Sequence, residues 1–292
     1  MKKLAIGSKT FDLSKKTLIM GILNVTPDSF SDGGKFTNLN DAICHAHEMI
    51  KQGADIIDIG GESTRPGAEP VSEEEEIKRI IPLIDTLLSE KEMLISVDTS
   101  KSTVAELAIN HGAVMINDVT ALRSDKAMAG VIASYQIPVC LMHMKGSPQT
   151  MQRQPKYDDV IKEIHSFFKK QIKYAKDNKI NKKQIIIDPG IGFGKRTGKG
   201  IEDNCEILAR LDEFKKLGYP IMIGASRKRF IGNICGKDKP LPSDMRLEGS
   251  LAAACAAVLN GADILRVHDV KETRRCIDII DCIKQQIYTD EK

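Results

Sequence analysis

The chain of 292 residues carries 43 basic and 40 acidic side chains, so its net charge is only +3. Such a balance argues against a nucleic-acid or membrane surface and favours small-molecule chemistry. Hydrophobic residues make up 41% of the chain and Trp is absent, which predicts a globular protein whose core is built from aliphatic side chains.

The N-terminal segment and the cysteines bear on the compartment. Residues 1–16 include no apolar run long enough for a signal peptide, and nowhere do about 18 apolar residues run together. The seven cysteines show neither a C-x-x-C pair nor a zinc-binding spacing, so we expect reduced thiols. We predict a cytoplasmic protein with no membrane or nucleic-acid partner, in which residues 1–16 form a short extension that could be a hairpin.

Short apolar segments alternate with longer amphipathic segments along the whole chain. The strand candidates are residues 17–24, 55–60, 93–98, 113–118, 138–143, 184–189, 220–226 and 263–268. Helices are predicted at 40–52, 73–90, 101–110, 157–178, 202–216, 244–259 and 269–287. Strict alternation indicates βα units, and eight of them favour an α/β fold closed into a single (β/α)8 barrel over residues 1–292. An open doubly wound sheet is the alternative.

Several helix ends carry recognisable signals. Gly53, Gly112 and Gly261 each precede an Ala and a strand, which predicts left-handed glycines at helix C-termini. Ser72 and Glu75 have the spacing of a capping box at the start of the helix 73–90.

Polar residues end every predicted strand. They are Asn24, Asp58, Asp98, Asn117 with Asp118, His143, Asp188, Ser226 with Lys228, and Arg266 with His268. A single Asp or Asn could equally cap a helix or bond within the core. Because the carboxyl ends of barrel strands converge on one face, polar residues at all eight ends favour a functional site there.

These polar residues fall into two chemical groups. Asp98, Asn117 and Asp188 suit a planar heterocycle that presents several N–H donors. A second group is cationic, or becomes so on protonation, and suits a phosphate or diphosphate. It consists of Arg65, Lys228, Arg266 and His268.

Oxygen-bearing side chains cluster after the first strand. Asn24, Asp28 and Asp32 supply the hard ligands that Mg²⁺ accepts beside a phosphate. The sequence therefore indicates a magnesium site next to the cationic group.

Three loops are rich in glycine or other turn-forming residues. TPDSFSDGG and GGESTRPGAEP follow the first two strands and are longer than a minimal βα turn, which predicts functional lids. DPGIGFGK, after the sixth strand, resembles a glycine-rich phosphate cradle but lacks the P-loop and dinucleotide patterns.

Eight stretches in chain order resemble the motifs of the dihydropteroate synthase family. They are GILNVTPDSFSDGG, DIIDIGGESTRPGA, ISVDTSK, INDV, MHMKG, DPGIGFGK, ASRKRFIG and LRVHD, and they run from residue 21 to residue 269. The pterin-binding domains of methyltetrahydrofolate-dependent methyltransferases are similar in barrel and acidic pocket, but lack this pairing of Ser-Thr-Arg-Pro and Ser-Arg-Lys loops. A non-catalytic pterin-binding protein is a further alternative.

The resemblance implies an activity. Members join (7,8-dihydropterin-6-yl)methyl diphosphate to p-aminobenzoate in folate biosynthesis, use Mg²⁺, form homodimers and are targets of sulfonamides. The small-residue segment SLAAACAAVL would suit packing against a second copy, or equally against the barrel.

The resemblance also implies residue roles. The pterin and diphosphate would be bound by Thr64, Asp98, Asn117, Asp188, Lys228, Arg266 and His268, and Mg²⁺ by Asn24. The p-aminobenzoate site would consist of Phe30, Arg65, Pro66 and Phe193, and the catalytic group of Lys228, Arg266, Asp98 and Asp32. Many members carry Ser after the Ser-Arg-Lys motif, whereas this chain has Arg229, so the family's amine contact at that position does not carry over.

No motif marks out an activated Cys–His or Ser–His nucleophile. We therefore hypothesise a dissociative substitution, in which the bond to diphosphate breaks before the arylamine attacks. Pterin diphosphate would then bind before the amine.

Overall fold

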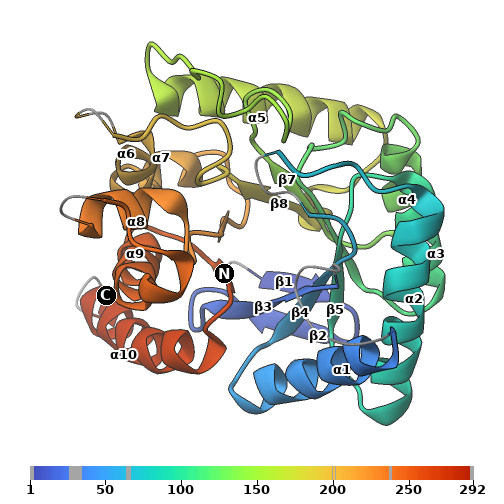
Figure 1. Ribbon diagram of the computed structural model, residues 1–292. Coiled ribbons are helices and arrows are strands. Elements are labelled where there is room, and N and C mark those ends of the chain that lie inside the picture. Colours follow the sequence, from blue (N-terminus) through green and yellow to red (C-terminus); the bar gives the residue numbers. More distant parts are fainter. Residues whose placement is uncertain are drawn as a thin grey trace.

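The computed structural model contains an eight-stranded parallel sheet that is nearly closed as a barrel and surrounded by helices (Figure 1). It describes residues 3–25, 35–63, 67–198, 200, 202–236 and 239–289. The strand order is β8-β7-β6-β5-β4-β3-β10-β9, and an isolated parallel bridge between Ile187 and Ile221 joins the two outer strands. The predicted (β/α)8 barrel is confirmed, and the open sheet is excluded.

The element bounds are as follows. The strands are β1 Lys3–Ile6, β2 Lys9–Asp12, β3 Leu18–Asn24, β4 Ile56–Gly60, β5 Ile95–Asp98, β6 Met115–Asp118, β7 Val139–Met142, β8 Ile185–Asp188, β9 Met222–Ile223 and β10 Ile264–Val267. The α-helices are α1 Lys35–Lys51, α2 Glu73–Glu90, α3 Ser102–Asn110, α4 Met128–Tyr135, α5 Val160–Asp177, α6 Asp203–Ala209, α7 Asp212–Lys215, α8 Arg229–Cys235, α9 Leu247–Leu259 and α10 Val270–Thr289. Short 3-10 helices cover Lys182–Gln184 and Ser243–Met245.

Each of the eight strand candidates contains a barrel strand, and the main errors lie between them. The candidate at 220–226 shrinks to β9, because the chain turns away after Ile223 and Arg227 adopts a left-handed φ of 57°. The helix predicted at 202–216 is two helices, α6 and α7. The helices α4 and α8 were not predicted, and neither has a side-chain N-cap that could have signalled its start.

The glycine signal at Gly112 is confirmed, whereas only half of the predicted capping box forms, because the Glu75 carboxylate accepts a hydrogen bond from Arg79 at 2.9 Å. The Ser72 hydroxyl accepts a hydrogen bond from the Glu75 N–H at 3.2 Å. Gly112 has a φ of 101°, and after it the Ala113 N–H bonds to the Ala108 carbonyl at 2.9 Å, which closes the end of α3.

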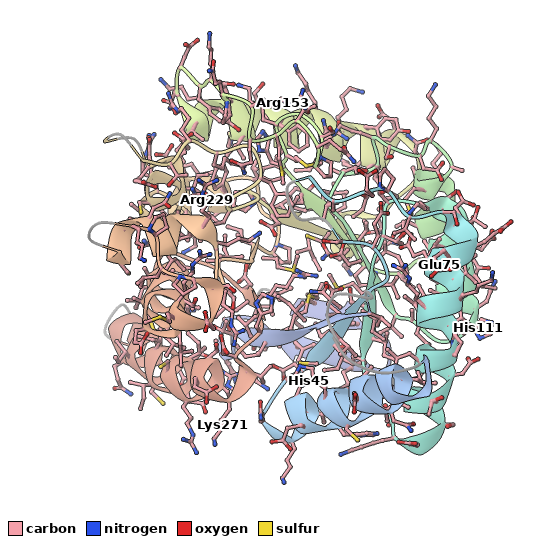
Figure 2. The ribbon with its side chains drawn as sticks, viewed as in Figure 1. His45, Glu75, His111, Arg153, Arg229 and Lys271 are labelled. Atoms are coloured by element: carbon pink, nitrogen blue, oxygen red, sulfur yellow. The ribbon has the colours of Figure 1, made fainter. Side chains whose placement is uncertain are left out.

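Side chains of the barrel strands alternate between two environments. Outward residues such as Ile19 and Ile57 belong to one cluster that packs the strands against the helices. Inward residues at the strands' amino ends, such as Met20 and Ile56, form a second cluster inside the barrel. In Figure 2, side chains fill the space between strands and helices, while Glu75 lies on the outer helical layer.

An antiparallel hairpin of β1 and β2 lies against the amino-terminal end of the barrel. Leu4 and Ile6 are at most 1% exposed and join the inner cluster, so the hairpin closes this end. With this end closed, the described part of the barrel offers a ligand the cavity at its carboxyl-terminal end. Among the described residues, no helix is long and apolar enough to span a membrane.

We expect Ile6→Ala to destabilise the protein by about 2–5 kcal/mol, because it removes a buried side chain from the closed end of the barrel. The midpoint of denaturant unfolding measures the change. Lys9→Ala, on the exposed side of the same hairpin, is the control. Equal midpoints for both variants would contradict a sealing role for the hairpin.

Candidate active site

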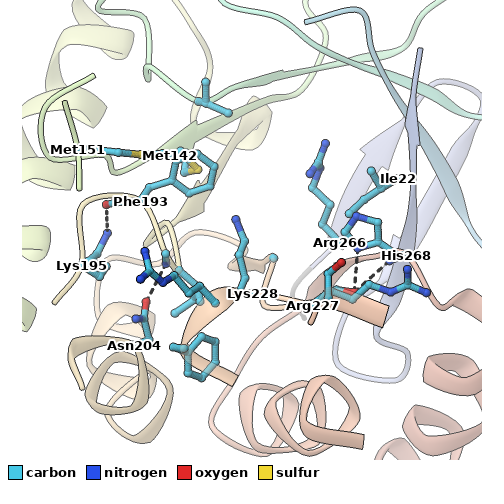
Figure 3. A pocket seen from close by; sticks show the side chains of 18 of the residues that line it. Ile22, Met142, Met151, Phe193, Lys195, Asn204, Arg227, Lys228, Arg266 and His268 are labelled. Atoms are coloured by element: carbon cyan, nitrogen blue, oxygen red, sulfur yellow. Dashed lines mark hydrogen bonds between the residues drawn. The ribbon is translucent and has the colours of Figure 1, made fainter. Parts of the chain in front are cut away.

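A cavity of about 910 Å³ opens at the carboxyl ends of the barrel strands (Figure 3). Its size suits a drug-sized or cofactor-sized ligand. The structure brings eight of the predicted site residues together around it: Asn24, Asp98, Asn117, Asp188, Phe193, Lys228, Arg266 and His268. The other candidates, Asp28, Phe30, Asp32, Thr64, Arg65 and Pro66, lie outside the described residues.

The alternation of the strands decides which polar residues face the cavity. Asn117 lies two residues after the inward Met115 on β6, and it lines the cavity. Its neighbour Asp118 faces the other way, and its carboxylate accepts hydrogen bonds from the backbone N–H groups of Thr120 and Leu122. The two polar residues at the end of β6 therefore have separate roles, one at the site and one in a turn.

Arg266 is held by two carboxylates from different strands. Its Nε lies 2.6 Å from Asp58 Oδ2, and its Nη2 lies 2.8 Å from Asp98 Oδ2. Asp58 is fully buried and also accepts from the Asn117 amide nitrogen at 3.0 Å. Removing one partner of such a buried pair typically costs about 3–5 kcal/mol. This network fixes Arg266 and Asn117 before any ligand arrives.

Burial raises the pKa values of two carboxyl groups that line the cavity. It raises the pKa of Asp98 to about 7, although Arg266 opposes the shift. Burial likewise raises the pKa of Asp188 to about 6, against the hydrogen bond from the Gly190 N–H and the charge of Lys228. Both carboxyls therefore titrate near neutral pH.

Lys228 presents an ammonium group to the same cavity. Its Nζ lies 4.1 Å from the centre of the Phe193 ring, a cation–π contact. Burial, together with the charge of Arg266, lowers its pKa to about 8. Figure 3 shows Lys228 between Phe193 and Arg266.

His268, which the sequence analysis grouped with the cations, is uncharged at neutral pH. Its Nδ1 lies 3.0 Å from the Ser226 hydroxyl, and burial together with the nearby Arg266 lowers its pKa to about 3. At neutral pH the ring therefore offers a hydrogen bond to a phosphate rather than a charge.

The Ser-Arg-Lys segment is a turn fixed by its central residue. Arg227 turns away from Lys228 and forms two bonds with the Asp269 carboxylate, at 2.5 Å and 3.0 Å. The Arg227 backbone is held as well, because its carbonyl accepts from Arg246 at 2.8 Å. Lys228 consequently starts α8 from a rigid position.

The DPGIGFGK loop does not form the phosphate cradle that its glycines suggested. The N–H groups of Gly190, Gly192 and Phe193 bond within the protein, to Asp188, Asn204 and the Gly190 carbonyl. The loop instead surrounds a cation, since Lys195 donates to the carbonyls of Gly190 and Phe193 at 2.8 Å and 3.0 Å.

The described residues contain no group of three or more His, Cys, Asp or Glu that could hold a metal ion. Asn24 lines the cavity at the end of β3 and offers an amide oxygen. Mg²⁺ is usually held by few protein ligands together with substrate phosphates and water. The single amide oxygen of Asn24, in a cavity that also contains Lys228 and Arg266, fits a metal ion held in this way.

Sequence reasoning overlooked two participants. Asp58 was recognised as a polar strand end but not as the partner that holds Arg266. Lys195 was read only as part of a glycine-rich loop, although its side chain is 1% exposed. The signal that could have identified Lys195 is its place directly after the uncharged segment PGIGFG.

Comparisons with known proteins agree on one family. The family model described as "Pterin binding enzyme" matches residues 20–268. Escherichia coli dihydropteroate synthase is 48% identical over 281 residues, which cover 96% of this chain and 96% of that protein.

Solved structures give the same relationship. The crystal structure of Yersinia pestis dihydropteroate synthase with a sulfonamide drug has a TM-score of 0.89 and 42% identity, covering 97% of this chain and 99% of that one. The Xanthomonas albilineans enzyme in complex with 7,8-dihydropteroate has a TM-score of 0.84 and 39% identity, covering 97% and 98%. With near-complete coverage in sequence and structure, the chain belongs to the pterin-binding enzyme family and, within it, to the dihydropteroate synthases.

Proposed function

We propose that the protein condenses (7,8-dihydropterin-6-yl)methyl diphosphate with p-aminobenzoate, giving 7,8-dihydropteroate and diphosphate in folate biosynthesis. One observation carries the proposal: the acceptors of Asp98, Asn117 and Asp188 share a cavity with the cations of Lys228 and Arg266. Membership of the family supports it, as does the dihydropteroate bound to the related Xanthomonas enzyme.

The inner part of the cavity would hold the pterin ring. Asp98 and Asp188 offer carboxylate oxygens to its N–H donors. Asn117 gives its amide nitrogen to Asp58, so its amide oxygen is left for the ligand. These groups lie on rigid strands, so recognition needs little reorganisation.

The outer cations would hold the diphosphate. The Lys228 ammonium and the Arg266 guanidinium provide charge, and His268 provides a neutral N–H donor. Thr64 is a further candidate from the sequence. Stabilisation of the departing anion by fixed charges is often the largest catalytic contribution.

Asn24 would hold Mg²⁺ together with diphosphate oxygens, with Asp32 a catalytic candidate nearby in sequence. When bound, the ion would neutralise charge that develops on the leaving group. The proposal is supported by the amide oxygen at the cavity edge.

The amine site would lie at the outer end of the cavity, against Phe193. Its ring packs on methionine side chains and on Lys228, which gives an apolar wall for an aromatic substrate. Phe30, Arg65 and Pro66 would complete the site, as the family resemblance implies.

The reaction would be dissociative. The C–O bond to diphosphate breaks first, the cationic methylene on the pterin is stabilised by Asp98 and Asp188, and the arylamine then attacks and loses a proton. Among the described residues that line the cavity there is no cysteine, which supports a path without a cysteine nucleophile.

We also propose that the protein forms a homodimer and that it works in the cytoplasm. Leu259, Ile279 and Ile283 are at least 44% exposed on the neighbouring helices α9 and α10, an apolar surface that suits a second copy. All seven cysteines are free, which supports the cytoplasm.

Mixing the protein with the pterin diphosphate, p-aminobenzoate and Mg²⁺ should yield dihydropteroate and diphosphate in equal amounts. Arg266→Ala should lower kcat/KM on the order of a hundredfold or more, because a charge that stabilises the leaving group is lost. The control is Arg210→Ala, which removes an outer-surface arginine paired with Glu206 and Glu213. Tight pterin binding without product would instead favour a non-catalytic binding protein.

The pH dependence follows from three side chains. Asp98 and Asp188 must be ionised to accept N–H donors, and Lys228 must be protonated to attract diphosphate. With pKa values of about 7, about 6 and about 8, kcat/KM for pterin diphosphate should peak between about pH 7 and pH 8 and fall on both sides.

Lys228→Arg distinguishes the two limbs of this profile. Its guanidinium stays charged at alkaline pH, so the acidic limb should remain and the alkaline limb should disappear. An unchanged alkaline limb in this variant would refute the assignment to Lys228.

Asn24→Ala should raise the Mg²⁺ concentration needed for half-maximal activity about tenfold or more. Loss of a residue that only supports a metal ligand already weakens metal binding by about tenfold, and Asn24 is proposed as a direct ligand. Titration of activity with Mg²⁺ after chelation measures it. Asn178→Ala, on the outside of the barrel at the end of α5, is the control. Identical Mg²⁺ requirements in the unaltered protein and in both variants would contradict the assignment of Asn24 to the metal site.

A further inference from the structure

Lys195 is a buried cation that the proposed reaction does not use. Its side chain is 1% exposed, and Nζ lies within 3.1 Å of three acceptors: the Gly190 carbonyl, the Phe193 carbonyl and His143 Nδ1. A fourth, the His143 carbonyl, lies at 3.5 Å. An ammonium group surrounded by carbonyl oxygens is a structural tie rather than a group exposed to a substrate.

Keeping a charge at this position is costly. Desolvation lowers the pKa of Lys195 to about 7, with Asp188 and Asp203 opposing the shift. An apolar side chain of similar length would avoid this cost. The role of the lysine is therefore sought in the groups that its hydrogen bonds connect.

The bonds join two neighbouring loops. Gly190 and Phe193 belong to the loop after β8, whereas His143 follows β7. The loops touch closely, because a Cβ on Gly190 would lie 2.0 Å from the His143 carbonyl oxygen, and Gly190 has a φ of 71°. The carbonyls of Gly190 and Phe193, three residues apart in the loop after β8, are thus bonded to one ammonium.

The bonds to Lys195 bear on the position of the Phe193 ring. The carbonyl of Phe193 is bound by Lys195, and its ring lies 4.1 Å from the Lys228 ammonium. The ring also packs beside Met142 and Met151. In Figure 3, Lys195 lies on the opposite side of Phe193 from Arg266. A change at Lys195 would thus reach the cavity through the ring.

We propose that Lys195 is a positioning residue that binds the carbonyls of the loop after β8 and thereby holds the Phe193 ring in place as the wall of the amine site. The inference rests on the proposed function, because it assigns Phe193 to p-aminobenzoate. Lys195 borders the cavity, but its ammonium donates to the carbonyls of Gly190 and Phe193, so it acts on the amine site through the Phe193 ring.

Steady-state kinetics of Lys195→Met test the proposal. The KM for p-aminobenzoate should rise on the order of tenfold or more, because the amine site loses its fixed wall. Lys195 lowers the pKa of Asp188, so binding of pterin diphosphate is compared on the alkaline side, where Asp188 is ionised in both proteins. It should stay within about twofold there, since Asp98, Asn117 and Asp188 lie on strands. Lys182→Met, which removes a lysine over Tyr219 on the outer surface, is the matched control.

A fluorescent reporter tests how firmly the side chain at position 193 is held, independently of activity. The chain has no Trp and 5 Tyr, so Phe193→Trp introduces a single tryptophan at the site, which is excited at wavelengths where tyrosine does not absorb. Adding Lys195→Met should shift its emission to longer wavelength and increase quenching by acrylamide, whereas adding Lys182→Met should leave both unchanged. If Lys195→Met does not fold, Lys195→Gln, which keeps fewer N–H donors, takes its place and should give smaller changes in the same direction.

The outcomes are separable. A lower unfolding temperature with unchanged emission and unchanged KM for the amine would overturn the proposal, because Lys195 would then serve stability alone. If the unaltered protein makes no dihydropteroate, the proposed function fails, while the emission of the double variant still decides whether Lys195 positions residue 193.

Discussion

The strand residues of the site depend on the period-two alternation of side chains in a sheet that is nearly closed on itself. On β10, Ile264 points inward at the sealed end, and Arg266, two residues later, points inward into the cavity. Two strand residues span about 6.6 Å, so apolar core and polar site are consecutive layers of the same interior. A shift of one residue in register would turn Arg266 toward the helices.

The polar layer is arranged before a ligand arrives. Arg266 is held by ion pairs with Asp58 and Asp98, so it has little freedom to move. Lys228 has a ring contact but no carboxylate partner among the ion pairs of the described chain. Arg266 is therefore fixed, whereas Lys228 is available to an anion. This arrangement suits a substrate whose neutral ring and anionic leaving group must be bound at the same time.

Much of this was predictable from residue patterns. The strand order, the caps at Ser72 and Gly112, and the convergence of Asp98 and Asp188 follow from periodicity and from the geometry of parallel strands. The partnership of Asp58 with Arg266 does not, because these residues are 208 positions apart and meet only when the sheet closes. The family resemblance supplied the pterin and the amine, which pattern alone could not identify.

The loop after β8 shows why composition misleads. Glycines give a loop more conformational freedom to lose on folding than any other residue, so a loop with Gly190, Gly192 and Gly194 needs strong local bonds to keep one shape. Those glycines suggested exposed N–H groups for a phosphate, yet the N–H groups are used internally and the carbonyls turn to Lys195. The orientation of peptide groups depends on left-handed φ values that the sequence permits but does not impose. A buried lysine selects among them, because only the conformation with inward carbonyls satisfies its ammonium.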